Sequence, residues 1–144
     1  MEDMGSQEKM VEAYVQDGKK NEAVKLLFDL ISHYAQTHKF EKAESSRERL
    51  YEVNSLALDE IVKSAEIIER TRFDAMDAGH MDTWSQLYRQ LTKEESIALY
   101  YGMQNAVFDP GEIIYRQGKM NPNLYFVNAG EVKLFYAKDQ HAIL

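Results

Sequence analysis

The stretch FDPGEIIYRQGKMNPNLYFVNAGEVKLFYAKD, residues 108–139, decides the fold class that the sequence predicts. Apolar and polar residues alternate in it, and glycine, proline and asparagine interrupt it at short intervals. Near its start, Pro110 fixes its own backbone angle and Gly111 supplies the positive φ that a type II turn needs next. We therefore expect strands from residue 108 onward, whereas the sequence before residue 107 has the spacing of helices.

Three short apolar runs in this region are expected strands, and a fourth follows at residues 141–144. Turns bound the first three, and Gly118 and Gly130 lie where a curved sheet must bend sharply. The alternation directs one set of side chains toward an interior that side chains or one ligand can fill. The first three expected strands cover residues 113–115, 124–127 and 132–136.

Before residue 80, apolar residues recur every three or four positions, which predicts short antiparallel helices. Ser6 is the expected N-cap of the first helix, and Gly18 is its expected end. The second expected helix begins with Asn21 as its cap. The third covers residues 40–53, and the fourth runs from about Ser55 to about Gly79.

Five residues of the helical region recur after an offset of 20 positions. This rhythm resembles tetratricopeptide-type arrays, in which each helical unit buries its apolar stripe against its neighbours. A small helical bundle that serves as a packing or dimerisation surface is the alternative. The matched residues are Tyr14, Gln16, Lys19, Ala23 and Leu30 with Tyr34, Gln36, Lys39, Ala43 and Leu50.

A second unit begins near His80. A helical stripe runs from Trp84 to Leu91, and Thr92 and Glu95 form the pattern of a capping box that opens a helix over residues 93–104. We therefore divide the chain into a helical module, residues 1–79, and a unit of lead-in helices and strands, residues 80–144.

Residues 91–144 together resemble the first half of a cyclic nucleotide-binding domain. The resemblance implies an α+β fold, in which antiparallel helical hairpins precede the first strands of a jelly-roll-like β-roll. It also implies that the phosphate-binding cassette lies beyond Leu144, so that this chain is a truncated piece of a regulatory sensor. The residues that carry the resemblance are Gly111-Glu112, Gln117-Gly118, Leu124-Tyr125, Gly130 and Val132-Lys133-Leu134.

By the same resemblance, Tyr115 and Leu134 would line the base pocket, with plain core residues as the alternative. Cyclic AMP or cyclic GMP would bind the intact parent, and we expect no cofactor in this chain. His141 is the only histidine of the strand region, which disfavours a metal-binding cupin. His33 and His38 do not share a helical face, so we expect no metal site there either.

The charge distribution and the absence of catalytic motifs disfavour two classes of function. The net charge of −7 belongs to the residues before 107, which hold 20 acidic and 13 basic side chains, and a surface of this sign disfavours nucleic-acid binding. The charge-dense residues 41–52 read as a solvated helix face with local ion pairs, with a surface for a basic partner as the alternative. No nucleophile lies beside a base, and no glycine-rich phosphate loop is present, so we expect no enzyme.

No apolar segment is long enough to span a bilayer, so we expect a cytoplasmic protein without a membrane partner. The absence of cysteine excludes disulfides and leaves the compartment undetermined. Self-association through the helices and the exposed strands is expected, or a protein partner. The alternative to a cyclic-nucleotide sensor is a helical protein-interaction module with a purely structural β-roll.

Overall fold

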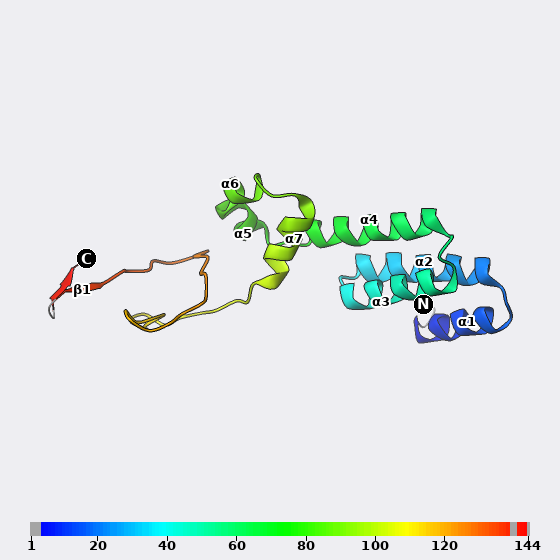
Figure 1. Ribbon diagram of the computed structural model, residues 1–144, viewed down its shortest axis with the longest axis horizontal. Coiled ribbons are helices and arrows are strands. Elements are labelled where there is room, and N and C mark those ends of the chain that lie inside the picture. The colour runs from blue at the N-terminus through cyan, green and yellow to red at the C-terminus, as the bar shows by residue number, and fades with distance from the viewer. Residues whose placement is uncertain (1–3, 139–140, 144) are drawn as a thin grey trace.

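The structure, a computed structural model, describes residues 4–138 and 141–143 (Figure 1). A bundle of four helices lies at one end, three shorter helices follow in the middle, and the rest of the chain extends away from them. The bundle helices are α1 (Met4–Gln16), α2 (Lys20–Gln36), α3 (Phe40–Val53) and α4 (Leu58–Asp74). The shorter helices are α5 (Ala78–Thr83), α6 (Ser85–Tyr88) and α7 (Lys93–Gly102).

Helix α2 is the centre of the bundle, because α1, α3 and α4 all pack against it. Its apolar residues recur at three- and four-residue spacing, and most of them are buried, whereas Leu26 and Phe28 are partly buried. Burying one leucine or isoleucine side chain contributes about 1.5–3 kcal/mol, so this stripe is the main source of stability in the bundle. The core comprises Val11, Ala23, Val24, Leu27, Leu30, Ile31, Tyr34, Ala35, Ala43, Leu50, Val53 and Ile68.

The 20-residue repeat in the sequence is also a repeat in the structure. The amide of Lys19 donates to the carbonyl of Tyr14, and the amide of Lys39 donates to the carbonyl of Tyr34, at 2.8 Å in each case. Both bonds belong to a Schellman motif, the helix ending that closes on a residue of positive φ. Gly18 occupies that position in the first loop and a histidine occupies it in the second.

The matched small and branched residues of the repeat are buried in equivalent places. Ala23 and Ala43 are fully buried in the first turn of α2 and α3, where the backbones of neighbouring helices approach closely. Leu30 and Leu50 are buried one and a half to two turns later. The repeated residues therefore belong to one helix-loop unit that occurs twice in succession.

The expected helix starts are corrected in three places. Ser6 and Asn21 lie inside α1 and α2 and cap neither helix, and α4 begins at Leu58, three residues after Ser55. Lys19, the residue before α2, makes no side-chain cap bond. The reason is that the preceding Schellman loop already sets the direction of the chain as it enters the next helix.

The capping box at the start of α7 is confirmed. The amide of Glu95 donates to the Thr92 hydroxyl at 3.2 Å, and the amide of Thr92 donates to the Glu95 carboxylate at 2.8 Å. Helix α7 packs on the end of α4, where the Tyr101 hydroxyl donates to the carbonyl of Arg72 at 2.9 Å. The rings of Phe40 and Tyr101 also meet edge to face. These contacts join the second unit to the bundle.

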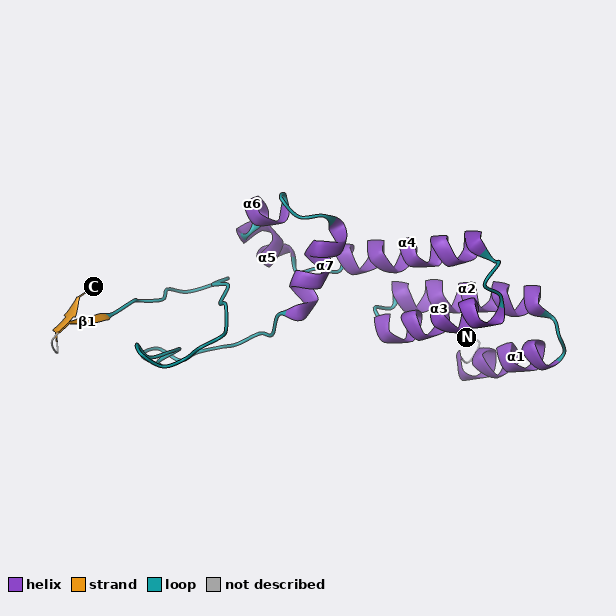
Figure 2. Ribbon diagram, viewed as in Figure 1, coloured by secondary structure: helices purple, strands orange, loops and turns teal. Residues whose placement is uncertain are grey.

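The expected α+β fold and the cyclic nucleotide-binding β-roll are wrong for the described residues. Residues 103–135, which we call the arm, contain neither helix nor strand (Figure 2). Beyond the arm the described residues hold one short antiparallel hairpin, in which β1 (Tyr136–Lys138) pairs with β2 (His141–Ile143). Leu144, the last residue of the fourth expected strand, lies outside the described residues. The fold is therefore helical.

Turn chemistry without strand pairing explains the failure of this prediction. The amide of Glu112 donates to the carbonyl of Asp109 at 2.9 Å, and Gly111 has φ 84°, so the expected turn is present. The runs that flank it do not pair with one another, however, and Leu124 is 80% exposed. A strand is stabilised by ladder hydrogen bonds and cross-strand side-chain contacts, and the arm supplies neither.

Candidate protein-interaction surface

A groove of about 330 Å³ lies between α3 and α4. Four of its lining residues come from α3 and recur at the spacing of one helix face, whereas Leu50 and Val53 of the same helix are buried in the core. Ile61 forms the opposite wall from α4. The residues of α3 that line the groove are Arg47, Glu48, Tyr51 and Glu52.

Two exposed aliphatic side chains lie near Ile61 on α4. Leu58 and Val62 lie three residues before and one residue after Ile61, so the three share one stretch of the helix surface. Leu58 is 64% exposed and Val62 is 54% exposed, and the Tyr51 ring across the groove is exposed as well. Contiguous exposed apolar side chains with a polar rim are typical of binding surfaces.

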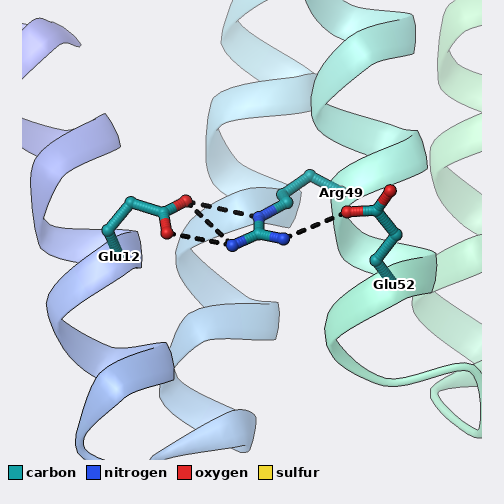
Figure 3. A network of polar contacts seen from close by, with 3 residues as sticks. All are labelled: Glu12, Arg49 and Glu52. Carbon is teal, nitrogen blue, oxygen red and sulfur yellow. Dashed lines mark hydrogen bonds and ion pairs between the residues drawn. The ribbon is translucent and has the colours of Figure 1, made fainter.

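Arg49 connects α3 to α1, and one of its two carboxylate partners, Glu52, lines the groove (Figure 3). Its guanidinium contacts a carboxylate oxygen of Glu12 on α1 at 2.9 Å and one of Glu52 on α3 at 3.0 Å. Hydrogen bonds to Glu52 and Glu12 raise the pKa of the Arg49 guanidinium. One positive charge thus serves two carboxylates, of which only Glu52 lines the groove.

Arg47 lines the groove with an unused donor. Its Nε–H is shielded from water and has no hydrogen-bond partner among the described residues. A longer ion pair, 3.6 Å, joins its Nη1 to Glu44, which Arg72 also contacts at 3.7 Å. Buried donors are nearly always satisfied in native proteins, so Arg47 is a donor that a bound acceptor could use after a side-chain rotation.

The two residues expected to line a base pocket are not brought into one site. Tyr115 is 51% exposed and borders an open depression of about 420 Å³ on the arm. Leu134 is 70% exposed and does not border that depression. Hydrogen bonds from the Asn123 and Asn121 amides lower the pKa of Tyr125 in the same depression, but no helix or strand holds these side chains in place.

The structure shows a buried histidine cluster that sequence analysis missed. His80, the third residue of α5, is 4% exposed. Its Nδ1 lies 2.9 Å from Oδ1 of Asn128, and its Nε2 lies 2.8 Å from the hydroxyl of Tyr88. The indole N–H of Trp84 donates to the same Asn128 oxygen at 2.9 Å. If Nδ1 carries the histidine proton, the Asn128 oxygen accepts from both rings and the Tyr88 hydroxyl donates to Nε2.

The cluster anchors part of the arm to the short helices. The Phe126 ring lies edge to face against Trp84, with ring centroids 5.0 Å apart, and against His80 at 6.1 Å. Residues 126–128 are therefore held on α5 and α6, although they lie more than 40 positions later in the sequence. The spacing of His80 and Trp84, four residues apart in a helical stretch, is the one sequence signal that could have indicated a shared face.

Two classes of site find no geometric support in the described part of the chain. No three histidine, aspartate or glutamate side chains there gather into a metal-binding group. No described helix is both long enough and apolar enough to cross a membrane.

Comparisons with known proteins return no relative. No family model matches the chain, and no curated protein or solved structure gives a significant match. The resemblances to cyclic nucleotide-binding domains and to tetratricopeptide arrays therefore gain no support from them, and the functional argument rests on the geometry of the surface between α3 and α4.

Proposed function

We propose that the four-helix bundle is a protein-interaction module that binds a short segment of a partner in the groove between α3 and α4. The observation that carries the proposal is the groove that Ile61 and Tyr51 line together with charged side chains, next to the exposed Leu58 and Val62 on α4. Docking an apolar face into a groove between helices is a recurring mode of peptide recognition.

The bundle supports this role because it is already assembled. The helices that form the walls of the groove are held by the buried residues of α2, by Leu50 of α3 and by Ile68 of α4. A partner segment would meet a preformed surface, so the free-energy cost of ordering falls mainly on the partner. The lining contains a guanidinium, two carboxylates and a phenol, but no serine, cysteine or histidine, so we assign it binding and no chemistry.

Peptide selection on the full chain tests the proposal. A random peptide library is panned against the wild-type chain, and enriched peptides are then titrated against the double variant Tyr51→Ala, Val62→Ser. We expect enriched peptides to lose at least tenfold in affinity for the double variant, because the variant removes the tyrosine that lines the groove and the exposed apolar side chain next to Ile61. Each substitution is on an exposed side chain, so circular dichroism should show an unchanged helical content.

A matched control separates a specific groove from a generally adhesive chain. Val107→Ser removes an aliphatic side chain that is fully accessible and lies on the arm instead of the bundle. Peptides should bind this variant as they bind the wild type. Failure to enrich any peptide, or equal loss of affinity in the control and the double variant, would contradict the proposed function.

A further inference from the structure

Residues 113–119 of the arm combine exposed apolar side chains with positive charge. Ile113 and Tyr115 are both exposed, and they lie two residues apart in the sequence. Arg116 and Lys119 follow at once, and between residues 113 and 128 they are the only charged side chains. This part of the arm is therefore an apolar pair followed by two positive charges.

The groove has the complementary arrangement. Its apolar walls are Tyr51 and Ile61, and its charged lining residues are Glu48, Glu52 and Arg47, so the lining holds one more acidic than basic side chain. Helices α3 and α4 together carry nine acidic and six basic side chains, so their excess charge is negative. Positive potential on the arm and negative potential on the groove would steer the two together and fix the register of docking.

The arm of a given chain is held away from its own groove. Asn128 ties residues 126–128 to α5 and α6, which follow the end of α4 that contacts α7, whereas Ile61 lies near the beginning of α4. Eleven residues of helix separate Ile61 from Arg72, which is about 16 Å at the α-helical rise. In Figure 1 the bundle and the arm lie at opposite ends of the molecule.

We propose that the segment that fills the groove is residues 113–119 of a second copy of this chain. Ile113 and Tyr115 of one copy lie against Tyr51 and Ile61 of the next, and Arg116 lies beside Glu48. This inference rests on the proposed function of the groove and adds the identity of the occupant.

The wild-type chain and two charge variants test this contact in sedimentation velocity over a range of protein concentrations. We expect the wild type to associate as its concentration rises. Glu48→Lys and Arg116→Glu each reverse one charge of the pair, and each should weaken association roughly tenfold, which corresponds to about 1.4 kcal/mol. An equimolar mixture of the two variants should associate again, because the basic groove of one variant then meets the acidic arm of the other, and the unaltered groove and arm form the original pair.

These substitutions leave the fold intact. Glu48 is exposed, and Arg116 takes part in its turn through a backbone carbonyl that accepts from the amide of Lys119 at 3.1 Å. Leu134→Ser, which removes another exposed aliphatic side chain of the arm, is the matched control and should associate as the wild type does. Ile113→Ser should reduce association as the charge variants do.

Three outcomes would overturn the inference: a monomer at every concentration, association that neither charge variant changes, or equal loss in Leu134→Ser. If the chain remains monomeric while selected peptides still bind the groove, the proposed function stands and the occupant is a different protein. If peptides also fail to bind, both proposals fall.

Discussion

At the scale of single residues, the two Schellman loops have the same backbone hydrogen bonds, but their residues of positive φ differ in conformational free energy. Gly18 has φ 71°, which glycine adopts freely, and His38 has φ 57°, which costs a residue with a side chain about 1–2 kcal/mol. The ring of His38 stacks on Phe40, which offsets part of this cost. The sequence signalled the first loop through its glycine, but the second could be recognised only from the repeat.

Substitutions at these two positions should affect the free energy of unfolding differently. We expect Gly18→Ala to lower the free energy of unfolding by about 1 kcal/mol, because it places a Cβ in the left-handed region. His38→Gly should leave the free energy unchanged or raise it by up to about 1 kcal/mol, since the relief of strain exceeds the lost ring contact. Urea titrations followed by circular dichroism measure both, and a loss of stability in His38→Gly would contradict this account.

Tyr34 should make the free energy of unfolding of the bundle fall at alkaline pH. Burial, together with its hydrogen bond to the Glu8 carboxylate and the nearby charge of Glu8, raises the pKa of Tyr34 to about 12 from 10. Below pH 10 the tyrosine is protonated in both states and the stabilisation is complete. Above it the unfolded tyrosine loses its proton first, so the folded state holds more protons and the free energy of unfolding falls as pH rises toward 12.

We therefore expect Tyr34→Phe to flatten the fall in stability between pH 10 and pH 12. Some slope should remain, because burial also raises the pKa values of Tyr88 and Tyr101. Near neutral pH the variant should lose about 1 kcal/mol, the usual net value of one hydrogen bond. Denaturation midpoints measured across this pH range are the test, and equal slopes in variant and wild type would show that Tyr34 is not responsible.

At the scale of the secondary-structure elements, periodic helices were predictable and strand pairing was not. The spacing of Val24, Leu27 and Ile31 is contained within a single helix, so the sequence alone indicates α2. The turn at residues 109–112 is equally local. A sheet, by contrast, requires one run to find another, and nothing inside residues 113–115 specifies whether a partner strand is present.

The candidate surface could likewise be predicted only where its contacts lie within one helix. The ion pairs within α3, such as Arg49 with Glu52, were expected from their spacing. The groove was not, because Ile61 and Tyr51 belong to different helices. His80 and Asn128 are 48 residues apart, and no periodicity connects residues across such a distance.

The cluster around His80 should control the position of the arm. We expect Asn128→Ala to release residues 126–128 from α5 and α6, since the variant removes the oxygen that accepts from Trp84 and contacts His80. Amide exchange in this segment should then accelerate and the fluorescence of Trp84 should shift, while exchange in α1–α4 stays slow. Asn123→Ala, on the arm but without contact to Trp84, is the control, and identical exchange in both variants would contradict the role of the cluster.

At the scale of the whole molecule, the bundle closes through an ion pair that connects its first and third helices. Arg49 and Glu12 are 37 residues apart and both are partly exposed, so the pair contributes at most about 1 kcal/mol and is screened by salt. We expect Arg49→Met to accelerate amide exchange in α1 at low salt and to have a smaller effect at high salt. An effect equal at both salt concentrations would indicate lost side-chain packing instead.

The bundle that carries the groove and the arm lie at opposite ends of the molecule (Figure 1), so the proposed contact between copies has a direction. Each copy offers one acceptor and one donor, and unless a ring closes, growth continues from both ends. A chain shortened to residues 1–107 would retain the acceptor and lack the donor. Added in small amounts, it would act as a terminator, and the mean length of the assemblies would fall as its mole fraction rises.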